Sequence, residues 1–135
     1  MRLLLDTHVL LWAAVDPERL GEVAGVLEDA DNEVLVSAAS SWEIAIKYGL
    51  DRLPLPEPPE RYVPHVFREL DVTPLGIEHS HALAVAALPP HHRDPFDRML
   101  VAQAQQLRIP IVTTDEMLDD YDVDVLLVGR AQALD

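Results

Sequence analysis

The chain has 135 residues, of which 49% are hydrophobic, and we expect residues 1–135 to form a single compact domain with its own apolar core. It contains no cysteine, which excludes disulfide bonds and thiolate–zinc sites and fits a reducing, cytoplasmic location. No apolar run approaches the ~20 residues of a transmembrane helix, so we expect no membrane span. The formal net charge of −14 disfavours a simple nucleic-acid-binding module, although cations held in an acidic site would reverse the local field.

Short apolar runs alternate with longer stretches of helical spacing along the chain. In chain order we expect a strand at 2–5, helices at 9–14 and 19–29, a strand at 33–36, helices at 38–48 and 59–69, a strand at 71–74, helices at 78–87 and 95–107, and strands at 109–113 and 123–128. A loop rich in proline, residues 53–59, interrupts the middle of the chain. Strands that alternate with helices predict an α/β fold with a mainly parallel central sheet.

Four acidic residues stand at the points where such a sheet would bring them together. Asp6 and Asp115 each follow an apolar run, and Glu43 and Asp97 lie near the starts of expected helices. The carboxyl ends of parallel strands share one edge, and several carboxylates buried there repel each other unless a counter-charge is supplied. Hard oxygen ligands without thiols favour Mg²⁺ or Mn²⁺. The pattern therefore predicts metal-dependent chemistry on phosphodiesters.

Each acid has an alternative interpretation as part of a helix start. Asp6 and Asp115 suit N-cap positions, residues 40–43 match a capping box, and Asp94 suits the N-cap of the helix that contains Asp97. Taken singly, capping is the better explanation for each acid. The joint placement favours the metal site, because Asp97 falls on the apolar face of its helix, where a purely solvent-facing acid is not expected. Asp94 is left outside the metal site as a cap.

Supporting roles are assigned to four further side chains. The hydroxyls of Thr7 and Thr114 would hold water or a phosphate oxygen, or make a local cap. Lys47 would orient Glu43 or meet phosphate, or form an ordinary helix ion pair. Arg98 would contact an RNA backbone or pair with Asp94. The six histidines are expected to lie in solvent.

Four stretches together resemble a PIN domain, of the kind found in VapC-like ribonuclease toxins. They are residues 4–8 (Leu-Leu-Asp-Thr-His), 41–47 (Ser-Trp-Glu-Ile-Ala-Ile-Lys), 94–104 (Asp-Pro-Phe-Asp-Arg-Met-Leu-Val-Ala-Gln-Ala) and 113–115 (Thr-Thr-Asp). The resemblance implies a three-layer α/β/α sandwich, and Mg²⁺- or Mn²⁺-dependent endoribonuclease activity that leaves a 3′-hydroxyl and a 5′-phosphate. It places the family's catalytic and metal-binding acids at Asp6, Glu43, Asp97 and Asp115. It also implies a homodimer and a cognate antitoxin whose basic tail enters the acidic site.

Three other functions remain open on the sequence. A housekeeping RNA-processing nuclease would use the same chemistry. A non-catalytic PIN scaffold would normally have lost acids, and none of the four is missing here. A receiver-like signalling domain would show an adjacent acid pair after the first strand and a lysine after the last, whereas Thr7 follows Asp6 and no lysine follows Val112.

Overall fold

A five-stranded parallel sheet forms the centre of the protein in the computed structural model, which describes residues 1–129. The strands lie in the order β3-β2-β1-β4-β5, with β1 in the middle. Their bounds are Arg2–Leu5 for β1, Glu33–Ser37 for β2, Thr73–Leu75 for β3, Ile111–Thr113 for β4 and Val125–Leu127 for β5. The α/β fold with a parallel sheet is therefore confirmed. The expected domain of residues 1–135 extends beyond the described part by residues 130–135.

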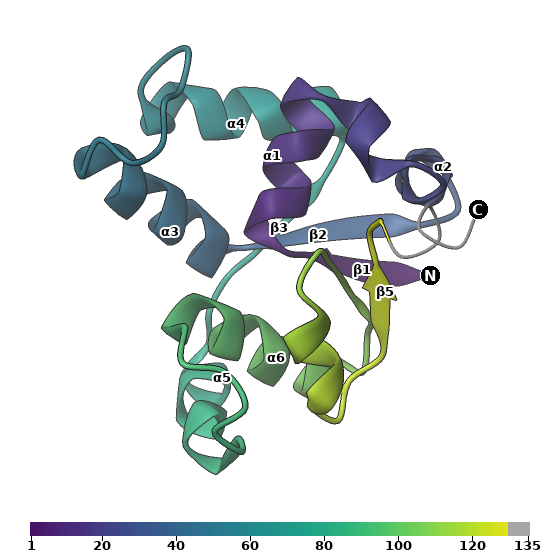
Figure 1. The fold of residues 1–135 in the computed structure, drawn as a ribbon, viewed down its shortest axis with the longest axis vertical. Coiled ribbons are helices and arrows are strands. Elements are labelled where there is room, and N and C mark those ends of the chain that lie inside the picture. Colours follow the sequence, from purple (N-terminus) through teal and green to yellow (C-terminus); the bar gives the residue numbers. More distant parts are fainter. Residues whose placement is uncertain (130–135) are drawn as a thin grey trace.

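Helices cover both faces of this sheet. They are α1 (Thr7–Val15), α2 (Val23–Glu28), α3 (Ala38–Gly49), α4 (Pro59–Leu70), α5 (His79–Ala84) and α6 (Pro95–Leu107), with 3₁₀ helices η1 (Pro17–Leu20), η2 (Val85–Ala87) and η3 (Glu116–Asp120). Figure 1 shows α1, α2 and α4 on one side of the sheet and α5 and α6 on the other. None of these helices is long and apolar enough to cross a membrane, within the part of the chain that the structure describes.

The central strand β1 explains why two separate cores form. Successive residues of a strand point to opposite faces. Leu3 and Leu5 accordingly belong to the core under α1, α2 and α4, whereas Leu4 belongs to the core under α6. All three side chains are at most 1% exposed, which is expected of a parallel strand covered on both faces. The three-layer α/β/α arrangement follows from this double burial.

Two expected helices differ from the prediction. The helix expected at 19–29 is divided into η1 and α2, because Gly21 between them adopts a positive φ of 57° that a continuous helix does not allow. The helix expected at 78–87 consists of α5 followed by the tighter turn η2. The helix expected at 95–107 is confirmed residue for residue as α6.

The sheet order determines where the acidic residues lie. β2, β1 and β4 are neighbours, and all three run in the same direction. Asp6 follows β1 directly, α3 follows β2 directly, and Asp115 lies just beyond β4. Three carboxyl ends of strands therefore meet at one edge of the sheet, as the sequence predicted.

Candidate metal site

Asp6 is buried at the centre of this edge. The residue is 3% exposed, and its Oδ2 accepts a hydrogen bond from Thr113 Oγ1 at 2.6 Å. It occupies the N-cap position of α1, but its side chain makes no capping hydrogen bond. Burial raises the pKa of Asp6 and the negative charge of Glu43 adds to this, while the hydrogen bond from Thr113 and the nearby His8 act in the opposite direction. The carboxylate is thus available for a role other than capping.

Glu43 approaches from α3 and is equally buried, with 2% of the residue exposed. The N-cap of α3 is Ser37, whose side chain accepts from Ala39 N at 3.0 Å, so the alternative capping box at residues 40–43 was wrong. Glu43 Oε2 lies 2.5 Å from Lys47 Nζ, and this contact raises the pKa of Lys47. Glu43 Oε1 is buried with no hydrogen-bond partner among the described residues. An unpaired buried carboxylate oxygen is costly, so a ligand for it is expected.

Asp97 lies in the first turn of α6, three residues after the residue that caps this helix. Asp94 is the N-cap, and its Oδ1 accepts from Phe96 N at 2.8 Å and from Asp97 N at 3.3 Å, which confirms its expected role. The pKa of Asp97 is raised to about 7, first by burial and then by the negative charges of Asp6 and Asp94. A carboxyl that holds its proton this strongly lacks sufficient positive charge nearby.

Asp115 is the fourth acid and lies two residues beyond the carboxyl end of β4. Its Oδ1 accepts from Met117 N at 2.9 Å and caps η3, so the capping interpretation holds for this oxygen. Its Oδ2 lies 2.8 Å from His92 Nε2. The Thr113 hydroxyl, which donates to Asp6, also accepts from Asp115 N at 3.0 Å and so connects the two acids.

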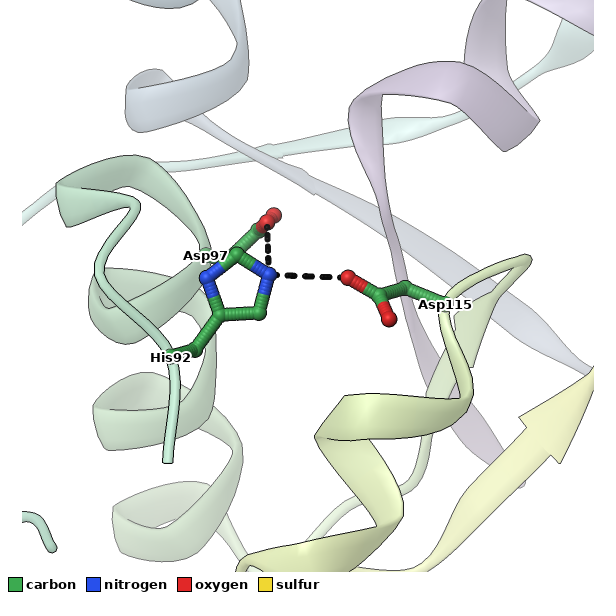
Figure 2. Close-up of side chains that lie close together, drawn as sticks. All are labelled: His92, Asp97 and Asp115. Atoms are coloured by element: carbon green, nitrogen blue, oxygen red, sulfur yellow. Dashed lines mark hydrogen bonds and ion pairs between the residues drawn. The ribbon is translucent and has the colours of Figure 1, made fainter. Parts of the chain in front are cut away.

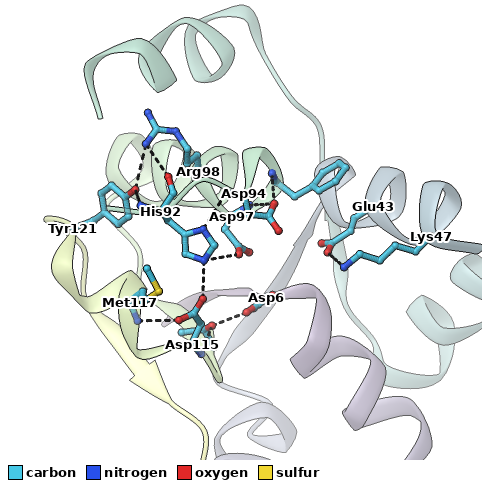
Figure 3. Close-up of polar contacts among 12 residues, drawn as sticks. Asp6, Glu43, Lys47, His92, Asp94, Asp97, Arg98, Asp115, Met117 and Tyr121 are labelled. Atoms are coloured by element: carbon cyan, nitrogen blue, oxygen red, sulfur yellow. Dashed lines mark hydrogen bonds and ion pairs between the residues drawn. The ribbon is translucent and has the colours of Figure 1, made fainter. Parts of the chain in front are cut away.

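The side chains from these four elements surround a common region. Figure 3 shows Asp6 and Asp115, which precede α1 and η3, directed toward it together with Glu43 of α3 and Asp97 of α6. Within the described residues, the group with ligand atoms mutually within 4.8 Å consists of His92, Asp97 and Asp115, drawn in Figure 2. Asp97 and Asp115 are therefore close enough to share one cation. Asp6 and Glu43 face the same region from outside this group.

The supporting residues take different places. Thr7 is buried, and its Oγ1 donates to Ser40 Oγ at 2.9 Å, joining the starts of α1 and α3. Thr114 is half-buried beside Asp115. Lys47 keeps its expected partner, Glu43. The guanidinium of Arg98 holds the loop before α6 by hydrogen bonds. It donates to Tyr121 Oη and to four backbone carbonyls, those of Val85, Leu88, Pro89 and His92.

The sequence interpretation missed three residues of this site. His92 was expected in solvent, but its side chain is only 16% exposed and contacts two of the acids. Thr113 and Tyr121 were not singled out, although they hold Asp6 and His92 respectively. The available signal for His92 was its position in the short loop that leads into the helix carrying Asp97.

The chain is similar in sequence and in fold to known proteins. The family model for the PIN domain matches residues 3–124. Ribonuclease VapC22 of Mycobacterium tuberculosis (strain ATCC 25618 / H37Rv) is 32% identical over 119 residues, which cover 87% of this chain and 90% of the relative. Ribonuclease VapC16 of the same strain is 44% identical over 64 residues, which cover 47% of this chain but only 45% of that relative.

Among solved structures, a VapBC2 complex from Rickettsia felis, bound to a DNA fragment from its promoter, contains a chain with the same fold. The TM-score is 0.73 at 12% identity, and the match covers 96% of this chain and all of the other. A likeness at this low identity concerns the fold. Together with the match over residues 3–124, it leads to one conclusion: the chain belongs to the PIN domain family.

Proposed function

We propose that this protein is a metal-dependent endoribonuclease and the toxin of a toxin–antitoxin pair. The observation that carries the proposal is the convergence of Asp6, Glu43, Asp97 and Asp115 at one edge of the sheet. The named relatives VapC22 and VapC16 are ribonucleases, and the PIN domain spans nearly the whole chain.

The side chains present fit a divalent cation with hard oxygen ligands. One carboxylate oxygen, Glu43 Oε1, is buried and unpaired among the described residues, and Asp97 retains a proton up to about pH 7. Both features are expected where carboxylates gather without enough positive charge. The donors around this region are mainly carboxylates, which suit Mg²⁺ or Mn²⁺ better than a soft metal.

In this proposal Asp97 and Asp115 would hold the cation together with Asp6. Glu43 would bind the cation or position the attacking water, and Lys47 would orient Glu43. A bound divalent cation makes water a better nucleophile and stabilises negative charge on phosphoryl oxygens. A bond forms between the water oxygen and phosphorus while the bond from phosphorus to the ribose O3′ breaks, and the water loses a proton to solvent while O3′ gains one from solvent. The products are a 5′-phosphate and a 3′-hydroxyl.

A partner protein belongs to the same proposal. The Rickettsia felis chain with the same fold comes from a structure of the VapBC2 complex. We infer that this chain likewise binds a cognate antitoxin with a basic tail, since its own net charge is −14 and its acidic site attracts cationic side chains. A homodimer and a cytoplasmic location, where RNA is abundant, complete the proposal.

Cleavage of labelled single-stranded RNA tests the proposed chemistry. We expect wild-type protein to cleave with Mn²⁺ and to stop on chelation with EDTA. Asp6→Asn and Asp97→Asn should each reduce the cleavage rate by about 100-fold or more, the scale seen when an electrostatic group of a transition state is lost. Asp119→Asn, an exposed site in η3 with the same change of charge, should retain activity. Equal cleavage by wild type and Asp6→Asn would contradict the assignment of Asp6.

A further inference from the structure

His92 is held by hydrogen bonds at every polar atom it has. Its backbone N donates to Tyr121 Oη at 2.8 Å, and its carbonyl accepts from Arg98 Nη1 at 3.4 Å. Its ring Nδ1 accepts from Asp94 N at 3.0 Å. Its ring Nε2 lies 2.8 Å from Asp115 Oδ2 and 3.3 Å from Asp97 Oδ2, as Figures 2 and 3 show. A surface histidine in solvent has no reason to be fixed in this way.

These contacts determine which ring nitrogen carries the proton. Nδ1 faces the backbone N–H of Asp94, so it must present a lone pair. The neutral ring then has its proton on Nε2, and this N–H points at the two carboxylates. Nε2 has no free lone pair in this tautomer, so the ring acts as a donor to the acids and is not suited to bind a metal.

The same contact argues against His92 as a proton donor to a leaving group. A ring that gives up a proton and remains neutral must first carry protons on both nitrogens. A proton on Nδ1 would meet the Asp94 N–H, which already occupies that position. The hydrogen bonds therefore favour a role for His92 in orienting the acids over a role as a proton donor in the reaction.

The loop that carries His92 is itself anchored. Arg98 Nη1 donates to the carbonyl of Pro89 at 2.9 Å, and Arg98 Nη2 donates to the carbonyls of Val85 at 3.1 Å and Leu88 at 3.3 Å. Arg98 stands on α6, one residue after Asp97, so loop and acid share one rigid support. A donor held on such a support can fix the orientation of the groups it contacts.

We propose that His92 is a positioning residue of the metal site, whose Nε2–H orients the carboxylates of Asp97 and Asp115 without binding the metal. This inference rests on the proposed function. Carboxylates that bind metals are commonly oriented by such hydrogen-bond donors, and loss of the donor lowers metal affinity about 10- to 100-fold.

Mn²⁺ binding to the purified full chain, measured by calorimetry, tests this role. We expect His92→Ala to weaken Mn²⁺ binding by about 10-fold or more. His92→Gln should remain close to wild type, because its amide N–H stands the same number of bonds from the backbone as the ring Nε2. His65→Ala removes an exposed histidine on α4 whose acidic partner is Glu69 and not Asp97 or Asp115, and it serves as the control. Circular dichroism of each variant checks that it is folded.

Electron spin-echo spectra of bound Mn²⁺ supply a second readout that does not depend on activity. We expect no ¹⁴N coupling of the size that a directly bound imidazole produces. Such a coupling, or equal loss of affinity in His92→Gln and His92→Ala, would mean that His92 is a ligand. Unchanged or tighter binding in His92→Ala would also overturn the proposal. If the wild type itself bound no Mn²⁺, the proposed function would fail as well, and the two failures are thus distinguishable.

Discussion

Asp97 shows how much the environment of a single carboxyl changes its chemistry. Its pKa rises from 3.8 to about 7, chiefly through burial, although its side chain is still 14% exposed. The neighbouring acids add to this effect and His92 partly offsets it. The folded, metal-free protein therefore binds a proton in a pH range where the unfolded chain has released it.

The stability of the metal-free protein should depend on pH through Asp97. Because the pKa is raised in the folded state, its ionisation destabilises the fold as pH increases from about 4 to about 7. The difference between these limits should be about 2–4 kcal/mol from this group, at 1.36 kcal/mol per pKa unit. Urea unfolding in EDTA at several pH values measures it.

Asp97→Asn should remove this contribution and flatten the curve of stability against pH. Asp119→Asn again provides a control with the same charge change at an exposed position. Parallel curves for wild type and Asp97→Asn would show that the carboxyl titrates at its ordinary value.

At the scale of elements, the segment from η2 to the start of α6 depends on one side chain. This segment has little regular structure, yet it carries His92 and the α6 cap Asp94. Arg98 satisfies four of its backbone carbonyls with one planar guanidinium. An acidic site built from a loop and a helix thereby gains a fixed geometry.

Arg98→Lys should destabilise the protein although the charge is kept. A single ammonium group cannot reach acceptors spread over residues 85–92, so carbonyls are left without partners at about 1–3 kcal/mol each where they are buried. We expect a loss of about 2 kcal/mol in the free energy of unfolding, with faster hydrogen exchange in residues 85–94. Arg93→Lys, an exposed change in the same loop, should have almost no effect. Equal stability of both variants would contradict this account.

At the scale of the whole molecule, charge is the dominant property. The 24 acidic residues outnumber the 10 lysines and arginines, so the long-range field repels RNA and attracts basic proteins. RNA would then be attracted mainly by the positive field of cations bound at the site. A basic partner protein is attracted both by the overall negative charge and by the acidic site.

Expression of the chain alone in a bacterial host should arrest growth, and expression of Asp97→Asn should not. Co-expression of the product of the adjacent open reading frame should relieve the arrest, because a basic tail would neutralise the acids. Association of the two purified proteins should slow as salt rises from 50 to 500 mM, since ions screen the field. Growth counts and association rates are the measurements. Normal growth with active wild-type nuclease would favour a housekeeping role.

The sequence alone determined the features that depend on neighbours within one element. Three leucines in succession specified the buried strand β1, and Asp94 followed by Pro95 specified the start of α6, because caps and side-chain periodicity act over a few residues. The placement of four acids at strand ends and helix starts could also be predicted, since parallel strands end at one edge.

Only the tertiary structure decided the surroundings of those acids. His92 meets Asp115 across 23 positions and Thr113 meets Asp6 across 107, and the pKa of Asp97 follows from burial among such partners. Contacts of this kind depend on strand order and loop path, which no local pattern of residues encodes.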